Sequence, residues 1–307
     1  MSDLAAALAA AFPEQDVEAV ETIRQGNHKQ TAVVKRADAE TVVLQQSARP
    51  ESLRTEVALA RAIAERTSIP VPAVLASEDT DGVGYAVVEH VPGEDLHEQF
   101  TVLSADERRG VARTFGRTLA VLHETFTFDA YGPVEAREET LQATGPTDWP
   151  TWFRAYAQEG IDALPAALGD FRDQLRTAVD EAALPATPPA RLYPWDLRPG
   201  NALVRDGAVA AVLDWGGPLS AAPALAVAKT EHLVADWYVE DPQPLREAFR
   251  AGYRAVRALP EVPTVYRLVA VVCSAVDSRG EVTRPGYPEQ TGEAAVAFHR
   301  ERLRSLL

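Results

Sequence analysis

The chain has 307 residues, enough for one large domain or two modest ones with buried cores. A formal net charge of −15 argues against a nucleic-acid partner, because proteins contact nucleic acid with clustered lysine and arginine. No run approaches the roughly 20 apolar residues that span a bilayer. The start, MSDLAAALAAAF, carries no basic residue and predicts a short helix in place of a signal peptide. We therefore expect a soluble, cytoplasmic protein with no nucleic-acid or membrane partner.

The acidic residues are spread along the whole chain, and lysine occurs only at Lys29, Lys35 and Lys229. An acid-rich, lysine-poor surface is typical of proteins that stay soluble at high salt, where ions screen self-repulsion. We interpret the charge as a halophilic adaptation that says little about the substrate. The one cysteine, Cys273, lies in the apolar run YRLVAVVCSAV and is expected to be a buried structural thiol.

The first third of the chain is rich in predicted strands. Residues 17–46 alternate between apolar and polar, and TAVVKRA and TVVLQQ predict a hairpin around the polar turn DAE. Residues 49–67 have the apolar spacing of a helix, and residues 71–77 and 84–91 predict two further strands. Pro92 and the glycine after it then break the pattern.

The rest of the chain predicts mainly helices. Residues 103–124 open with a capping box, Ser104 and Glu107, and continue with an apolar stripe. The sequence thus predicts an α+β protein with two lobes, a small β-rich lobe and a larger helical one joined by a short hinge. Ligands tend to bind between such lobes.

Three polar residues stand out in the turn-punctuated stretch PWDLRPGNALVRDGAVAAVLDWGG, residues 194–217. The pair Asp206-Gly207 predicts a tight hairpin that brings Asn201 and Asp214 together, with Asp196 on the loop just before. Such an all-oxygen set is what Mg²⁺ prefers, with phosphates and water completing its shell. Taken singly, each residue is better explained as an ordinary turn residue.

The joint pattern resembles the protein-kinase-like phosphotransferases, which have D-x-x-x-x-N followed by Asp-aromatic-Gly. DLRPGN and VLDWG are closest to the aminoglycoside phosphotransferase family, whose signature runs HGDLHPGNVLV … VIDWE/G. The resemblance extends upstream through RTEVALARAIAERTSIPVPAVLA, the hinge-like VVEHVPGEDL and LAVLHE, and covers roughly residues 17–232. It implies a two-lobed protein-kinase-like fold, with a small antiparallel β-sheet lobe carrying one main helix. Residues 1–92 would form this nucleotide-binding lobe, and residues 93–307 the catalytic and substrate-binding helical lobe.

The resemblance also implies residue roles in an ATP- and Mg²⁺-dependent kinase. Asp196 would be the base that accepts or orients the substrate hydroxyl proton. Arg198 matches the position of the kinase catalytic-loop lysine and would stabilise charge on the transferred phosphoryl group. Asn201 and Asp214 would hold the metal.

In the first lobe, the resemblance implies a nucleotide site. The backbone from Glu89 to Val91 would meet the adenine. Glu56 would be the glutamate of helix C, since it lies at the edge of the apolar stripe and is expected to face inward. A solvated helix acid remains the alternative for Glu56.

Two positions depart from the family pattern. Gln45 occupies the place where the third strand should carry a phosphate-binding lysine or arginine. Lys29, three residues after Gly26, could reach in from the glycine loop, as in protein kinases that lack the usual lysine. Lys35 is the second choice, and two ordinary solvated lysines are the alternative.

The other departure is Pro194, which stands where the family has a histidine two residues before the aspartate. That histidine braces the loop, so we expect its loss to change support more than mechanism. Tyr193 or Trp195 could supply packing in its place.

The acceptor is expected to be a small molecule with a hydroxyl group. The chain passes almost directly from Gly217 into a helix, without the long activation segment on which peptide substrates dock. Sugars, amino alcohols and aminoglycoside-like compounds all remain open, and the helical lobe, including Glu231 and Asp236, would build the acceptor pocket. A nucleotide-binding pseudokinase is the main alternative, and a carboxylate-dependent glycoside hydrolase leaves the asparagine unexplained. The oligomeric state is left open.

Overall fold

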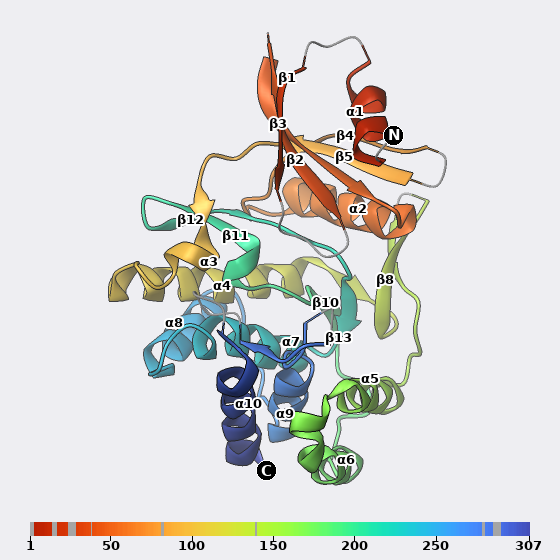
Figure 1. Cartoon of the computed structure of the whole chain (residues 1–307). Helices are drawn as coiled ribbons and strands as arrows, with labels where there is room; N and C mark the ends of the chain where they lie inside the picture. The colour runs from red at the N-terminus through yellow and green to blue at the C-terminus, as the bar shows by residue number, and fades with distance from the viewer. Residues whose placement is uncertain are drawn as a thin grey trace.

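The computed structural model describes residues 3–13, 17–23, 29–37, 39–80, 83–138, 140–277, 280–284 and 290–307. A sheet-rich part holds the N-terminal end of the chain, and a helical part holds the C-terminal end (Figure 1). Among the described residues, no helix is long and apolar enough to cross a membrane.

The N-terminal part is built on an antiparallel five-stranded sheet in the order β1-β2-β3-β5-β4. Its strands are β1 (Val17–Ile23), β2 (Gln30–Arg36), β3 (Ala39–Ser47), β4 (Val74–Thr80) and β5 (Val83–Glu89). The predicted β2–β3 hairpin is confirmed, with Thr31 opposite Gln45. Helix α1 (Asp3–Ala11) covers one face, where Phe12 joins Leu44 and Val87 in a small core.

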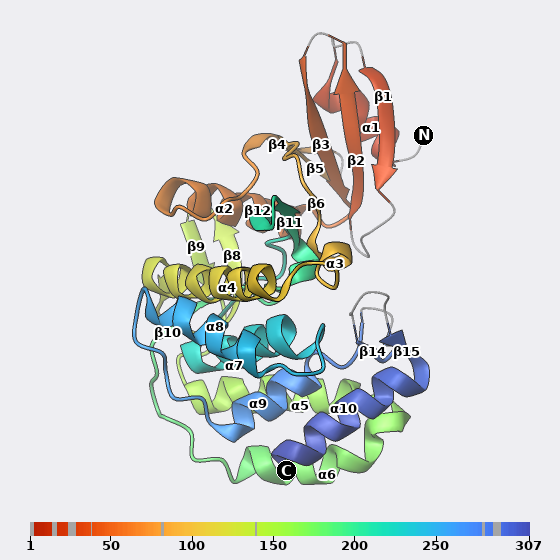
Figure 2. The ribbon, with the colours of Figure 1, turned by 90° about the vertical axis from the view of Figure 1, so that its left-hand side faces the viewer.

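Helix α2 (Pro50–Arg66) covers the opposite face of this sheet and also contacts the helical part. Pro50 starts the helix, because a proline at the first helical position loses no hydrogen bond. Leu53 packs with Ala86 of the sheet, whereas Leu59, further along, belongs to the large core of the helical part. Figure 2 shows α2 lying between the sheet and helix α4. This position carries Glu56 to the boundary between the two parts.

The C-terminal part is mainly helical. Its α-helices are α3 (Leu96–Gln99), α4 (Ala105–Thr125), α5 (Trp149–Ala163), α6 (Arg172–Asp180), α7 (Pro223–Glu231), α8 (Gln243–Arg254), α9 (Thr264–Val272) and α10 (Gly292–Leu306). The predicted capping box of Ser104 and Glu107 is present at the start of α4. Helices α4 and α8 touch backbone to backbone, because a Cβ at Gly116 or Gly252 would collide with the facing helix. The described residues also form two short 3₁₀ helices, η1 (Ala166–Phe171) and η2 (Pro199–Asn201), and one π-helix, η3 (His232–Asp236).

Short strands thread through the C-terminal part, and the sequence predicted few of them. One sheet has the order β12-β11-β6 and another the order β7-β10-β13-β8-β9, and β14 pairs with β15. Their bounds are β6 (Glu94–Asp95), β7 (Thr127–Phe128), β8 (Gly132–Arg137), β9 (Thr140–Ala143), β10 (Ala190–Tyr193), β11 (Ala202–Arg205), β12 (Ala208–Val212), β13 (Leu219–Ala221), β14 (Thr283–Arg284) and β15 (Gln290–Thr291). The predicted β11–β12 hairpin is confirmed, with Asp206 and Gly207 at φ 53° and 73° in its turn.

Candidate active site

The loop after β10 holds Asp196 and Asn201 against each other. Asn201 ends the turn η2, and its Nδ2 donates to the backbone oxygen of Asp196 at 2.9 Å and to Oδ2 at 3.0 Å. These two bonds fix the orientation of the amide. Among the described residues, no donor contacts Asn201 Oδ1, so this oxygen is available as a ligand.

Arg198 is the direct partner of the Asp196 carboxylate. Its Nε lies 2.9 Å from each of the two carboxylate oxygens. Gly200 leaves room for the guanidinium, because a Cβ there would collide with Arg198 Nη1. On its other side, Arg198 Cζ lies 6.0 Å from the ring centroid of Trp237.

Asp196 is held in its ionised form. Burial alone raises the pKa of its carboxyl, but the charges of Arg198 and Lys229 and the hydrogen bonds from Arg198 and Asn201 outweigh burial. The net pKa therefore lies below its ordinary value. A carboxylate in this state can accept a hydrogen bond from a substrate hydroxyl at neutral pH.

The β11–β12 hairpin brings Asp214 to the same site. The backbone N–H of Leu213 donates to the backbone oxygen of Asn201 at 2.8 Å, which closes the base of the hairpin. Asp214 itself has φ 55°, a left-handed conformation that aspartate tolerates better than most residues. Its side chain is 48% exposed, so the carboxylate is open to a ligand.

Lys29 reaches this site from the chain just before β2. Its Nζ lies 2.5 Å from Glu56 Oε1 and 2.9 Å from Asp214 Oδ1. The backbone N–H of Trp215 also hydrogen bonds to Glu56. Burial lowers the pKa of Lys29, but the two carboxylates more than offset burial, and the net pKa is raised. Lys29 therefore remains charged and links α2 to the segment after the hairpin.

The other predicted nucleotide residues of the sheet lie as follows. Gln45 shares a sheet face with Ala86, the face that α2 covers, and within the described ranges it makes no hydrogen bond to Glu56. Lys35 is exposed on β2, so Lys29 is the lysine that meets Glu56. Gly26 lies outside the described residues.

The predicted hinge follows the end of β5. Glu89 is exposed and closes the strand, with its backbone N–H donating to Ala73 O at 2.8 Å. Val91 lies two residues further on, before β6, and its backbone groups are not hydrogen bonded to any other described residue. The backbone of Val91 is thus free to meet a ligand.

A chain of hydrogen bonds braces the loop at Pro194. Trp195 Nε1 donates to Tyr156 Oη at 3.2 Å, and Tyr156 Oη lies 3.2 Å from Tyr193 Oη. Leu197 N donates to Pro194 O at 3.1 Å and tightens the turn. These hydrogen bonds hold Tyr193 and Trp195 in place on either side of Pro194.

Sequence reasoning missed Lys229. It lies on α7, is 1% exposed, and its Nζ sits 3.2 Å from the ring centroid of Trp195. Its one hydrogen bond among the described residues, to Cys273 O, is 3.4 Å long. Burial lowers its pKa to about 8, although Asp196 and the Cys273 thiol act in the opposite direction. The sequence did contain a sign of this buried lysine, because Lys229 is a charged residue inside the apolar run APALAVAKTEHLV.

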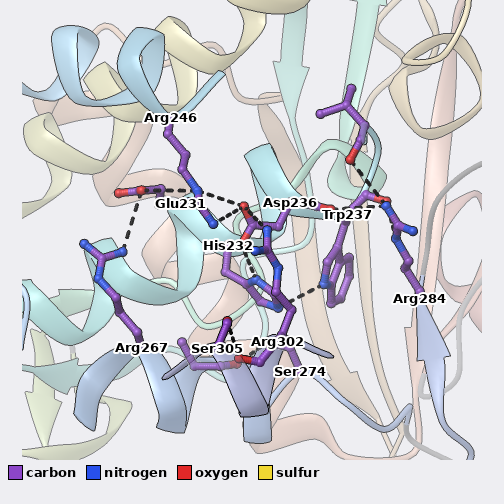
Figure 3. A network of polar contacts seen from close by, with 12 residues as sticks. Glu231, His232, Asp236, Trp237, Arg246, Arg267, Ser274, Arg284, Arg302 and Ser305 are labelled. Carbon is purple, nitrogen blue, oxygen red and sulfur yellow. Dashed lines mark hydrogen bonds and ion pairs between the residues drawn. The ribbon is translucent and has the colours of Figure 1, made fainter. Parts of the chain in front are cut away.

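Glu231 and Asp236 are both neutralised from within the protein (Figure 3). Arg250 Nη2 lies 2.6 Å from Glu231 Oε1, and Arg246 and Arg302 lie 2.7 Å and 2.9 Å from Asp236 Oδ1. His232 and Arg267 complete this set of contacts. The two carboxylates are therefore engaged by arginine and do not form an open acidic pocket, in contrast to what the sequence suggested.

The donor set fits Mg²⁺. Among the described residues, no group of three or more His, Cys, Asp or Glu side chains could enclose a metal ion. Asn201 Oδ1 and the half-exposed Asp214 carboxylate, whose Oδ1 pairs with Lys29, are the oxygen donors that the loop and the hairpin supply. Magnesium sites in phosphotransferases are of this kind, with one or two protein oxygens and the remaining ligands from phosphate and water.

A sheet-bearing part, a helical part and an Asp-Asn-Asp set beside their boundary define a small-molecule phosphotransferase of the protein-kinase-like type. Residues 19–266 match the model of the phosphotransferase enzyme family, and the chain belongs to this family. The family and the class of enzyme predicted from the sequence are confirmed. No curated protein matches the chain.

Solved structures agree on the fold. A thermostable mutant of aminoglycoside phosphotransferase APH(4)-Ia, in a ternary complex with AMP-PNP and hygromycin B, has a TM-score of 0.67 at 15% identity, over 100% of this chain and 98% of that one. A putative fructosamine-3-kinase from Haemophilus somnus 129PT has a TM-score of 0.63 at 14% identity, over 99% and 97%. The GDP and kanamycin complex of APH(2")-IIIa has a TM-score of 0.65 at 13% identity, over 99% and 97%. The predicted two-lobed protein-kinase-like fold is confirmed.

Proposed function

We propose that the protein transfers the γ-phosphate of ATP to a hydroxyl group of a small molecule and depends on Mg²⁺ for this reaction. The observation that carries the proposal is the joint placement of Asp196, Asn201 and Asp214, with Lys29 and Glu56 at the same boundary. Nucleotides bound to similar structures, AMP-PNP in one and GDP in another, support it.

Asp196 acts on the acceptor hydroxyl. Its lowered pKa keeps it ionised, so it orients the hydroxyl through a hydrogen bond and receives the proton as the new O–P bond forms. Arg198 fixes the carboxylate through both oxygens and adds positive charge where the phosphoryl group passes. This assignment makes Asp196 the base and Arg198 the electrostatic partner.

Asn201 Oδ1 and the Asp214 carboxylate would hold Mg²⁺. When bound, the ion would neutralise charge on the nucleotide phosphates. Asn201 contributes to both halves of the site, because its Nδ2 positions Asp196 while its Oδ1 faces away from that bond.

Residues 1–92 form the nucleotide lobe in this proposal, and residues 93–307 the catalytic and acceptor lobe. Lys29 replaces the strand lysine whose place Gln45 occupies, and it meets the phosphates while paired with Glu56. The backbone from Glu89 to Val91 binds the adenine, and Gly26, outside the described residues, stays a predicted nucleotide contact.

The acceptor is a sugar, an amino alcohol or an aminoglycoside-like compound in this proposal. Hygromycin B, kanamycin and the name fructosamine-3-kinase among the similar structures support a sugar-related acceptor. The cytoplasm, where ATP is abundant, is the proposed location. High salt is the proposed working condition, because the net charge is −15 with only three lysines.

A pseudokinase that binds nucleotide without turnover is the second candidate. Two positions favour it, Gln45 in place of a lysine and Pro194 in place of a histidine. The internal contacts of Lys29 and Trp195 argue against it, because each supplies the support that the substituted residue would otherwise give.

The test of the proposed activity is ADP release from ATP and Mg²⁺ with a panel of hydroxyl compounds, on wild type and Asp196→Asn. We expect turnover in wild type and a loss of about 10²- to 10⁴-fold in the variant, with unchanged ATP affinity. Wild-type nucleotide binding with no turnover of any acceptor would favour the pseudokinase. Equal turnover in both proteins would contradict the proposal that Asp196 is the base.

A further inference from the structure

Beside Asp196 lies a buried cation that the proposed reaction does not use. Lys229 is 1% exposed, and among the described residues it forms no ion pair with an acidic side chain. Its three N–H donors meet one carbonyl, that of Cys273, at 3.4 Å. A buried ammonium without a counter-charge is costly, so proteins seldom keep one without a reason.

The nearest carboxylate does not serve as the counter-charge of Lys229. Asp196 interacts with Lys229 electrostatically, but both of its oxygens are 2.9 Å from Arg198 Nε. Two cations therefore share one carboxylate at the point where the acceptor hydroxyl must bind.

The indole ring of Trp195 lies over the ammonium group of Lys229. Its ring lies over Lys229 Nζ at 3.2 Å from the centroid, yet the residue is 37% exposed. One side-chain hydrogen bond, Trp195 Nε1 to Tyr156 Oη at 3.2 Å, holds the ring in place. Trp195 is thus the partly exposed side chain that lies over the buried ammonium.

The neighbouring polar network points to the same charge preference. The carboxylates of Glu231 and Asp236 follow Lys229 along the chain and are the acids that could hold an amino group of a substrate, but both are engaged by arginines (Figure 3). Arg284 forms no ion pair with another described residue and donates to the backbone oxygen of Trp237 at 2.9 Å, although the charges of Asp236 and Glu240 act on it.

We propose that the acceptor substrate carries an acidic group, a carboxylate or a phosphate, which binds Lys229 in place of the Trp195 ring while a hydroxyl meets Asp196. The site then disfavours polycationic acceptors, because the ammonium of Lys229 repels amino groups. This inference rests on the proposed function and names the substrate class of that same site.

The test uses four polyols with the same carbon skeleton and different end groups: D-gluconate, D-sorbitol 6-phosphate, D-sorbitol and D-glucamine. Binding is measured by calorimetry at fixed ionic strength, with and without ADP. We expect one of the two acids to bind about tenfold more tightly than sorbitol, since hydrogen bonds to a charged group are the strong ones, and glucamine to bind most weakly. Whichever acid binds more tightly shows whether the acidic group of the substrate is a carboxylate or a phosphate.

Variants connect this preference to Lys229. Lys229→Met, which removes the charge and keeps most of the unbranched side chain, should reduce the acids to the affinity of sorbitol. Lys35→Met removes the same charge from an exposed position on β2 and should leave the preference intact. Trp195→Ala removes the ring that covers Lys229 and should tighten acid binding, which provides a second readout with Lys229 itself unchanged.

Three results would overturn the inference: no binding of either acid, binding of glucamine equal to that of sorbitol, or an acid preference that survives in Lys229→Met. An ATP titration on the same samples tests the proposed function separately. If the protein binds ATP but shows no preference for the acids, the proposed function stands and the inference about the substrate is wrong. If it prefers the acids but does not bind ATP, the proposed function is wrong and the acid site stands.

Discussion

Two of the three lysines of this chain lie at the candidate site, Lys29 beside Asp214 and Lys229 near Asp196, and their surroundings differ. Lys29 has two carboxylates within 2.9 Å, and its pKa is raised in spite of burial. Lys229 faces an indole ring and a carbonyl, and burial lowers its pKa to about 8. The same side chain is thus stabilised as an ammonium at one position and destabilised at the other.

The difference shows where each counter-charge comes from. Lys29 is balanced by the chain itself, through Glu56 of α2 and Asp214 after β12, so it joins the two parts of the molecule before any ligand arrives. Lys229 is not balanced by the chain, and we infer that a substrate balances it. Removal of one cation should therefore harm the folded protein, and removal of the other should help it.

The largest effect is expected for Lys29→Met. The change leaves the buried Glu56 carboxylate without its cation, which should lower the free energy of unfolding by about 3 kcal/mol or more and weaken ATP binding. Urea denaturation and an ATP titration measure the two effects. The double variant Lys29→Met/Glu56→Gln should recover most of the stability but not the ATP affinity. A stability loss within about 0.5 kcal/mol, no more than Lys35→Met shows, would mean that the ion pair is unimportant.

Lys229→Met should act in the opposite direction, with a dependence on pH. Between about pH 8 and 10.5 the unfolded chain binds a proton at this lysine that the folded protein does not, so wild-type stability rises with pH in this window. Across this window, the free energy of unfolding of wild type should rise by at most about 3 kcal/mol more than that of Lys229→Met. Urea denaturation of both proteins at several pH values measures it. Parallel stability curves would show that Lys229 is not destabilised by burial.

A smaller effect is expected for Gly200→Ala. The added Cβ collides with the Arg198 guanidinium and moves it away from Asp196. The pKa of Asp196, which Arg198 holds below its ordinary value, should then rise, and the acidic limb of kcat/KM should move to higher pH with it. An unchanged pH profile would contradict the role assigned to Arg198.

Local patterns predicted much of the fold. The β2–β3 hairpin followed from alternation, α2 from its apolar spacing, and the start of α4 from its capping box. The Asp206-Gly207 turn placed Asn201 and Asp214 at the base of one hairpin. Each of these features depends on residues close together in the chain, so a single sequence carries the information.

Long-range contacts could not be predicted in this way. Lys229 meets Trp195 across 34 positions of the chain, and the pairing of Glu231 and Asp236 with arginines depends on how α7, α8 and α10 pack. The short strands β8, β10 and β13 have too few residues for alternation to be visible. The pairing of Lys29 with Glu56 was proposed only because a family pattern left the place of Gln45 without a charge, and its role toward phosphate stays a prediction.

The most direct test of the central claim is a thermal-shift titration with ATP, with and without Mg²⁺, at high KCl, on wild type and Asp214→Asn. We predict that ATP raises the melting temperature of wild type more strongly when Mg²⁺ is present, and that this dependence on Mg²⁺ disappears in Asp214→Asn. If ATP leaves the melting temperature of wild type unchanged with and without Mg²⁺, the proposed phosphotransferase site is contradicted.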